Sequence, residues 1–158
     1  NGEFSVVSRD GYSMSNYPVV CVSWYGAKAF CDHYGYRLPT QWEWQAVADY
    51  NGTYSYGCGT TISKSKANYS DGGYANPIGL SSYPYTSPVG YYSSYGYGMC
   101  DMAGNVWEWT DSWSSSNPSK TILCGGGWNY YGSYCTVSYR FDKYPNGTFN
   151  YAGFRVCR

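Results

Sequence analysis

Asp101-Met-Ala-Gly-Asn-Val-Trp-Glu-Trp109 is the stretch of sequence that decides the fold of this chain. Its second half alternates two tryptophans, Trp107 and Trp109, with Glu108, and this is the period of a β-strand. A carboxylate that lies between two buried indoles has to be paired with donors. The stretch therefore predicts a core strand over 102–109 with a polar group inside it.

Two helices are expected on the N-terminal side of this stretch, and each has a start signal. Ser23 can cap a helix whose apolar residues recur at three- and four-residue spacing and which Gly35 ends. Thr40-Gln-Trp-Glu43 matches a capping box, in which the threonine hydroxyl and the glutamate carboxylate satisfy orphan backbone donors. The second helix should run to about Asp49.

The rest of the chain predicts long loops and short strands. Residues 52–98 are rich in Tyr, Ser and Gly and have no sustained period, so they predict irregular loops. Further short strands are expected at 18–23, 122–126, 135–139 and 153–157. Two short helices on small antiparallel sheets give an α+β fold, in a single domain over residues 1–158.

The composition argues against several classes of partner. Ten basic and ten acidic residues cancel, so no net positive charge favours nucleic acid. No apolar run approaches the roughly 20 residues that insert across a bilayer. The seven cysteines and the single His33 have no zinc-ligand spacing, so most cysteines are expected to be buried. The 22 tyrosines beside 20 glycines are typical both of packed loops and of adaptable binding surfaces.

Six sequence blocks follow one another from Tyr17 to Arg158. They are Pro18-Val-Val-Cys-Val-Ser-Trp-Tyr25, Arg37-Leu-Pro-Thr40 with Glu43-Trp44, Pro88-Val-Gly90, the stretch 101–109, Gly125-Gly-Gly-Trp128 and Gly153-Phe-Arg-Val156. In this order they resemble the formylglycine-generating-enzyme (sulfatase-modifying factor) family. The resemblance implies a C-type-lectin-like fold of that family's subtype. It implies less about activity, because one fold hosts many functions.

For members of that family that oxidise a substrate cysteine, the resemblance implies a copper-binding pair of cysteines five residues apart. Alignment on Gly125-Gly-Gly-Trp128 places Cys135 on the first position and Arg140 on the second. A guanidinium cannot replace a thiolate as a Cu(I) ligand, so neither copper nor catalysis is expected. The oxidase, or a related sulfatase-modifying enzyme, remains an alternative function. A fixed adhesion or carbohydrate-binding module is the second alternative function. Against it, the Asn-Pro pairs of this chain, Asn76-Pro77 and Asn117-Pro118, lack the flanking acidic residue found in calcium-dependent lectins.

The segment 125–156 resembles the variable region of proteins diversified by retroelements, in which template adenines are randomised and AAY codons change. Between Asn129 and Asp142 there is no Lys, Glu, Gln, Met or Trp, as that route requires. The resemblance implies a non-catalytic display protein, at the surface of a bacterium or phage, that binds varied macromolecular ligands, chiefly proteins. The candidate ligand-binding residues are Asn129, Tyr130, Tyr131, Gly132, Ser133, Tyr134, Thr136, Ser138, Phe141, Asp142, Thr148, Phe149, Asn150 and Tyr151.

A fixed frame is expected beneath these exchangeable residues. Strand alternation would turn Cys135, Val137 and Tyr139 inward and leave residues 129–134, Thr136 and Ser138 outward, with a second outward group at Phe141, Asp142, Tyr144 and 148–151. The frame residues are Trp107, Trp109, Trp128, Arg140 and Phe154.

The polar group of the deciding stretch has two interpretations. Glu108 either accepts hydrogen bonds from buried donors or, as the family resemblance would allow, holds a structural calcium ion together with Asn105. The first is the simpler interpretation, and no cofactor is required for binding.

Overall fold

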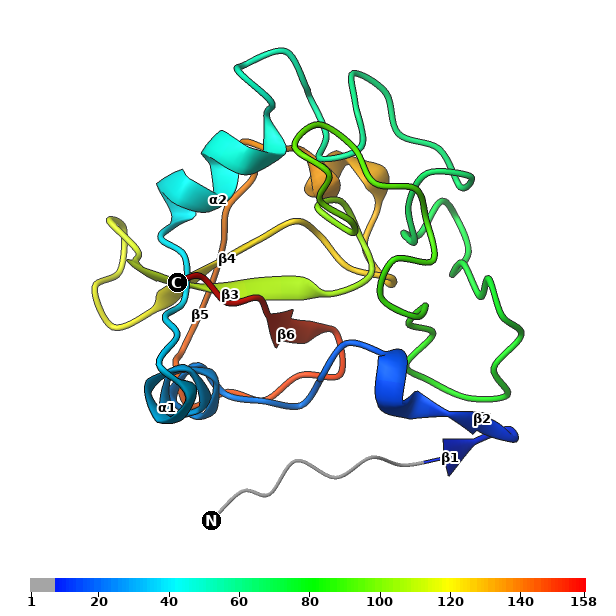
Figure 1. Ribbon diagram of the computed structural model, residues 1–158, viewed down its shortest axis with the longest axis horizontal. Coiled ribbons are helices and arrows are strands. Elements are labelled where there is room, and N and C mark those ends of the chain that lie inside the picture. Colours follow the sequence, from blue (N-terminus) through cyan, green and yellow to red (C-terminus); the bar gives the residue numbers. More distant parts are fainter. Residues whose placement is uncertain (1–7) are drawn as a thin grey trace.

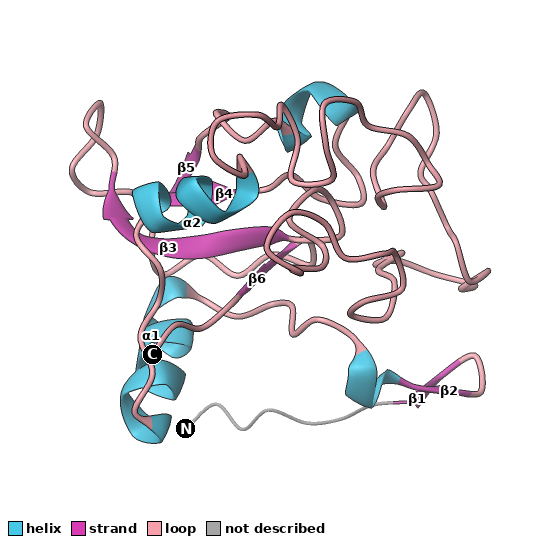
Figure 2. Cartoon of the chain, turned by 45° about the horizontal axis from the view of Figure 1, so that its top comes forward, coloured by secondary structure: helices cyan, strands magenta, loops and turns pink. Residues whose placement is uncertain are grey.

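The computed structural model describes residues 8–158 and has an α+β fold, as expected (Figures 1 and 2). Residues 1–7, which the expected domain includes, lie outside the described residues. The elements are β1 Ser8–Arg9, β2 Tyr12–Ser13, the 3-10 helix η1 Met14–Asn16, α1 Trp24–Tyr34, α2 Gln41–Ala48, β3 Trp107–Trp113, β4 Thr121–Cys124, the 3-10 helix η2 Gly132–Cys135, β5 Phe141–Lys143 and β6 Ala152–Phe154. No helix among these residues is long and apolar enough to cross a membrane.

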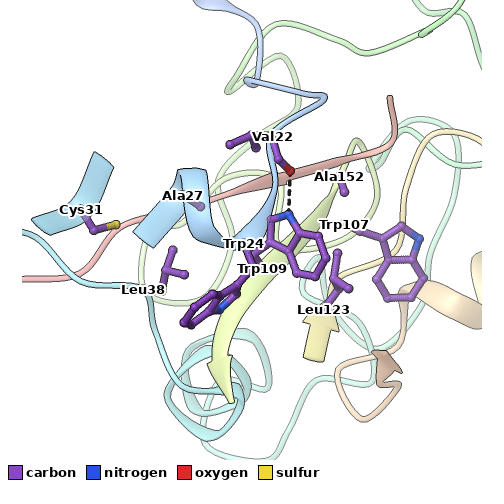
Figure 3. Packing of buried hydrophobic residues seen from close by; sticks show 9 residues of the cluster. All are labelled: Val22, Trp24, Ala27, Cys31, Leu38, Trp107, Trp109, Leu123 and Ala152. Atoms are coloured by element: carbon purple, nitrogen blue, oxygen red, sulfur yellow. Dashed lines mark hydrogen bonds between the residues drawn. The ribbon is translucent and has the colours of Figure 1, made fainter. Parts of the chain in front are cut away.

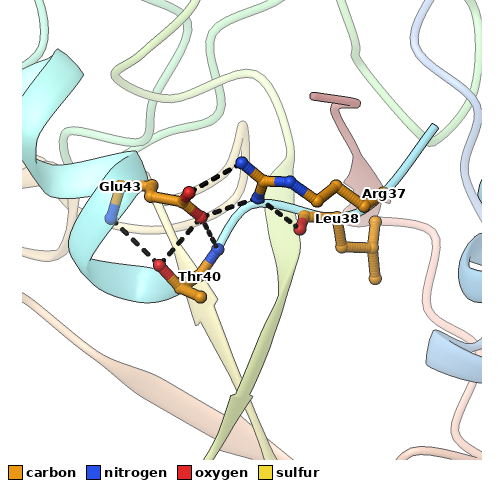
Figure 4. Close-up of polar contacts among 4 residues, drawn as sticks. All are labelled: Arg37, Leu38, Thr40 and Glu43. Carbon is orange, nitrogen blue, oxygen red and sulfur yellow. Dashed lines mark hydrogen bonds and ion pairs between the residues drawn. The ribbon is translucent and has the colours of Figure 1, made fainter. Parts of the chain in front are cut away.

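Both predicted helices form, and their caps are the predicted ones. The Ser23 hydroxyl accepts from the backbone N–H of Gly26 at 3.1 Å, and Gly35 ends α1 with a φ of +71°. At the start of α2, Thr40 and Glu43 form the reciprocal capping box (Figure 4). Arg37 also donates to both carboxylate oxygens of Glu43, at 2.8 and 2.7 Å, and this hydrogen bonding lowers the pKa of Glu43 to about 2.

The central sheet has the strand order β5-β4-β3-β6. β3 pairs antiparallel with β4 and parallel with β6, and β4 pairs antiparallel with β5. The sheet is therefore mixed, not antiparallel as predicted, because the chain crosses from β5 at one edge to β6 at the other edge, where it runs in the direction of β3. α2 lies above β3 and α1 below it in both views (Figures 1 and 2). β3 is therefore the strand around which both helices and the C-terminal strand are arranged.

The main core lies where β3 meets α1. Trp24 and Trp109 are buried in one cluster with apolar side chains from α1, β4 and β6 (Figure 3). The indole N–H groups of these two residues have partners, because Trp109 donates to the carbonyl of Val22 at 3.0 Å and Trp24 to the carbonyl of Thr110 at 2.9 Å. These bonds fix the segment that precedes α1 against the sheet.

Several predicted strands have different limits in the structure. The expected strand over 102–109 begins only at Trp107, because Asp101, Gly104 and Asn105 have φ values of +56°, +75° and +63°, which a strand does not accommodate. The expected strand over 122–126 spans 121–124, because two glycines with positive φ follow it. The expected strand over 153–157 spans 152–154.

Two predicted strands are absent from the described residues. The segment 18–23 is not a strand, because Cys21 has a φ of +58°. The segment 135–139 contains the end of η2 followed by a turn. Its side chains nevertheless alternate as expected in burial, since Cys135 and Val137 are buried whereas Ser138 is exposed. The predicted loops are confirmed, because residues 49–106, all of them described, hold no helix or strand.

Candidate functional site

The first half of the candidate variable segment is attached to the central loops through main-chain groups. The backbone N–H of Ser70 donates to the carbonyl of Tyr130 at 2.7 Å, and the N–H of Val137 donates to the carbonyl of Ser55 at 3.0 Å. These bonds do not depend on which side chain stands at either position. The long loops thus hold this half of the segment through its backbone.

The second half of the segment is held in the same way by the core. The backbone N–H of Cys21 donates to the carbonyl of Phe149 at 2.9 Å, and the N–H of Trp107 donates to the carbonyl of Tyr151 at 2.8 Å. Side-chain replacement at Phe149 or Tyr151 leaves both acceptors unchanged, although it alters the packing.

The candidate residues differ widely in exposure. Tyr131 is 57% exposed, and Ser133, Ser138 and Thr148 are also exposed. The partly exposed group consists of Asn129, Tyr130, Gly132, Tyr134, Thr136, Phe141, Asp142, Phe149, Asn150 and Tyr151. The fully exposed part of the candidate set is therefore smaller than the sequence pattern indicates.

The expected outward direction of several aromatic residues is corrected by the structure. Tyr130 and Phe141 pack on the buried ring of Trp107, with ring centroids 5.4 and 5.1 Å from it. Tyr151 lies 5.3 Å from Tyr130 and stacks on Phe149 at 5.1 Å. Burial, and next a hydrogen bond with Tyr151, raise the pKa of Tyr130 well above its usual range. The rings turn inward because burial of aromatic rings against the Trp107 cluster is favourable.

The neighbours Tyr130 and Tyr131 are expected to respond differently to truncation. Tyr130→Ala should lower the free energy of unfolding by about 2 kcal/mol, because it removes a half-buried ring from the Trp107 cluster. Tyr131→Ala should change it by less than about 0.5 kcal/mol, because that ring is exposed. Chemical denaturation of both variants measures the difference. Equal effects would mean that the two rings do not divide into support and surface.

Arg140 connects the candidate segment to α2. Its guanidinium donates to the side-chain oxygen of Gln41 at 2.9 Å, to that of Gln45, and to the carbonyl of Val137 at 2.9 Å. All of these contacts are within the protein, so Arg140 fixes the turn after η2 rather than facing a ligand.

Cys135, the position aligned with the first catalytic cysteine, is in the core. It is 0% exposed, and burial raises the pKa of its thiol to about 12. A buried, neutral thiol is not a nucleophile. Because Arg140 occupies the second position, these two residues do not fit a copper ion.

The polar group in the deciding stretch is a buried ion pair. Glu108 accepts from Arg155 Nε at 2.5 Å and Nη2 at 2.6 Å, and from the indole N–H of Trp44 at 2.6 Å. Asn105 instead exchanges hydrogen bonds with the backbone of Ser87, at 3.0 and 3.1 Å. The Glu108 and Asn105 side-chain oxygens are thus used within the protein and do not fit a calcium ion.

Comparisons with known proteins agree with this architecture. The family model of the sulfatase-modifying factor enzyme 1-like domain matches residues 6–158. The chain is 31% identical to the serine/threonine-protein kinase pkn1 of Chlamydia caviae over 97% of this chain and 25% of the kinase. It is also 31% identical to the formylglycine-generating enzyme of Thermomonospora curvata, over 89% of this chain and 55% of the enzyme. The chain thus spans between a quarter and about half of these relatives.

A solved structure with the same fold is Treponema denticola variable protein 1. It matches with a TM-score of 0.79 and 23% identity, over 93% of this chain and 73% of that chain. The fold is the expected C-type-lectin-like one. On the strength of the match over residues 6–158, this chain belongs to the sulfatase-modifying factor enzyme 1-like family.

Proposed function

We propose that this chain is a non-catalytic binding domain that displays exchangeable side chains, diversified by a retroelement, from its C-terminal segment to protein ligands. The observation that carries the proposal is the main-chain attachment of that segment. Backbone groups of Ser70, Ser55 and Trp107 hold it in place through hydrogen bonds that do not involve its side chains. A rigid frame beneath replaceable residues is the arrangement that a variable binding site needs. The fold similarity to a protein named as variable supports this function.

The shape of the molecule favours a macromolecular ligand. A cavity of about 280 Å³ is lined by residues around the Glu108–Arg155 pair, and none of the candidate variable residues lines it. A second cavity of about 110 Å³ is lined by α2 and residues 155–157, again without them. The exposed candidate residues therefore contribute to neither hollow, and an open surface of Tyr and Ser is typical of sites that bind proteins.

Two small libraries test this proposal. The first randomises Tyr131, Ser133, Ser138 and Thr148, all exposed, among residues that AAY codons can become. Most members should resist protease as the parent does, since exposed changes cost less than about 0.5 kcal/mol each. Capture on two unrelated proteins, hen egg-white lysozyme and streptavidin, should then select different members.

The matched control library randomises four buried positions. They are Trp107, Trp128, Cys135 and Val137. Most of its members should be degraded, because replacement of core residues leaves cavities that cost about 1 to 5 kcal/mol. If the first library is degraded as fully as the control, or folds but yields no binder, the segment is not a display surface.

The family alternative, oxidation of a substrate cysteine, is tested directly. The buried, neutral thiol of Cys135 and the guanidinium at Arg140 argue against it. Incubation of the protein with Cu(I) and a cysteine-containing peptide should leave the mass of the peptide unchanged. A formylglycine product would contradict the proposed function.

A further inference from the structure

A group of tyrosines outside the candidate variable segment borders it through Trp128. Trp128 is buried, and its indole N–H donates to the carbonyl of Asn150, a candidate variable residue, at 3.2 Å. Tyr83 stacks on the indole ring at 5.4 Å with an interplanar angle of 28°, and Tyr74 meets it edge-on at 5.2 Å. One buried ring, at the start of the segment 125–156, therefore contacts both the candidate variable residue Asn150 and the loop over 71–85.

The same loop starts at the variable segment. Ser70, just before it, forms a parallel bridge with Tyr131, and its N–H donates to the carbonyl of Tyr130. The loop is thus joined to the segment at two places, the Ser70 bridge and the Trp128 ring.

Tyr74 and Tyr83 are exposed although both contact Trp128. They are 50% and 56% exposed, and they also pack against each other at 5.4 Å. A ring with one side on a buried indole and the rest in solvent is restricted in its rotamers before any ligand arrives. Pre-ordered aromatic rings bind at low entropic cost, which is why they anchor protein-binding surfaces.

The backbone beneath Tyr83 is fixed by the β1–β2 turn. Arg9 donates to the carbonyl of Pro84 at 2.9 Å and to that of Ser82. The Asp10 carboxylate accepts from the N–H of Ser81 at 2.8 Å and from its hydroxyl at 2.5 Å. The backbone on both sides of Tyr83 is therefore held by hydrogen bonds from the β1–β2 turn.

The chemistry of this surface fits a protein rather than a glycan. The charged side chains of the β1–β2 turn, Arg9 and Asp10, both form hydrogen bonds with the backbone of the loop over 71–85. The amide of Asn76 is used in the same way, since it exchanges hydrogen bonds with the backbone of Leu80 at 2.7 and 2.8 Å. The exposed large side chains of the loop are the rings of Tyr74 and Tyr83, which lie beside the smaller polar residues Asp71, Ser81 and Ser82. Two aromatic rings bordered by polar groups suit the mixed apolar and polar surface of a protein ligand.

We propose that Tyr74 and Tyr83 form a fixed aromatic anchor that contacts the protein ligand of every variant, while the variable segment supplies specificity. This inference rests on the proposed function and adds to it a constant part of the binding surface. The residues of the anchor lie far from residues 125–156 in sequence, so a diversifying process confined to that segment leaves them unchanged.

The test uses members of the exposed-position library selected separately on lysozyme and on streptavidin. Tyr83→Ala and Tyr74→Ala are introduced into one binder of each kind, and Kd is measured for each target. Each substitution should weaken both complexes by about tenfold, as expected for truncation of an aromatic anchor. Tyr34→Ala is the matched control, because Tyr34 is 59% exposed but lies on α1, away from the loop (Figure 1). It should change Kd by less than about twofold.

The outcomes separate the two hypotheses. If the library yields no binder, the proposed function fails and the anchor fails with it. If binders are obtained but both tyrosine variants keep the parental Kd, only the anchor is wrong. Protease resistance is measured for each variant, and if Tyr83→Ala unfolds, Tyr83→Leu and the separate Tyr74→Ala variant decide the question. If neither weakens both complexes, the anchor is refuted.

Discussion

Glu108→Gln is expected to destabilise the protein by about 3 to 5 kcal/mol, although it only replaces a carboxylate oxygen with an amide nitrogen. Glu108 is only 7% exposed at its side chain and Arg155 20%. Removing the carboxylate charge deprives the buried guanidinium of Arg155 of the carboxylate that it hydrogen-bonds, and leaves only the weaker interaction with Asp101. Breaking a buried pair in this way costs that much. The measurement is the free energy of unfolding from chemical denaturation at neutral pH.

A second arginine–glutamate pair supplies the control. Arg37 and Glu43 make the same two-pronged contact, but their side chains are 45% and 44% exposed. Glu43→Gln should cost less than about 1 kcal/mol, because exposed pairs are weak and glutamine also serves in a capping box. Similar losses in the two variants would mean that burial does not decide the strength of the Glu108 pair.

Trp107→Ala is expected to lower the free energy of unfolding by about 3 to 5 kcal/mol and to abolish ligand capture. Trp107 is 0% exposed, and the rings of Tyr130, Tyr139 and Phe141 pack on it, so truncation leaves a large cavity beneath the candidate surface. Its indole N–H has no hydrogen-bond partner among the described residues. The loss is therefore one of packing, and Trp107→Phe should recover part of it.

The control for this substitution is an exposed tryptophan. Trp42 on α2 is 67% exposed, and its ring makes a cation–π contact with the guanidinium of Arg140 at 5.8 Å. Trp42→Ala should cost less than about 1 kcal/mol, the value of an exposed cation–π contact. Denaturation curves of the three tryptophan variants are compared with the parent. A stable Trp107→Ala protein that still binds would contradict the role of Trp107 as support.

The sequence predicted the local features of this fold well. Helix caps at Ser23 and at Thr40 with Glu43 are decided within four residues, so the pattern contains all the information that their geometry needs. The burial of Cys135 and Val137 was also predicted correctly, although the strand that justified it does not form. Apolar character at alternate positions specified which side chains are inside, but not the backbone conformation that places them there.

The exposure of the candidate site was predicted less well. The codon pattern treats Tyr130, Tyr131 and Tyr151 alike, whereas the structure buries parts of the first and last against the Trp107 cluster. The contacts of Tyr74 and Tyr83 with Trp128 could not be predicted from the sequence, because these two residues lie among many tyrosines in a stretch without hydrophobic periodicity. Only contacts between segments far apart in sequence distinguish them.

What the sequence by itself determined is the order of its blocks, the two capped helices, the α+β class and the requirement that Glu108 be paired. Each follows from residues within a few positions of one another or from the cost of burying an unpaired charge. Only the tertiary structure decided that the partner is Arg155, 47 residues away, and that Ser55 and Ser70 hold the candidate variable segment through backbone atoms. Backbone N–H and C=O groups are the same in every residue except proline, which lacks the N–H. The sequence therefore does not indicate which backbone groups will form hydrogen bonds with one another.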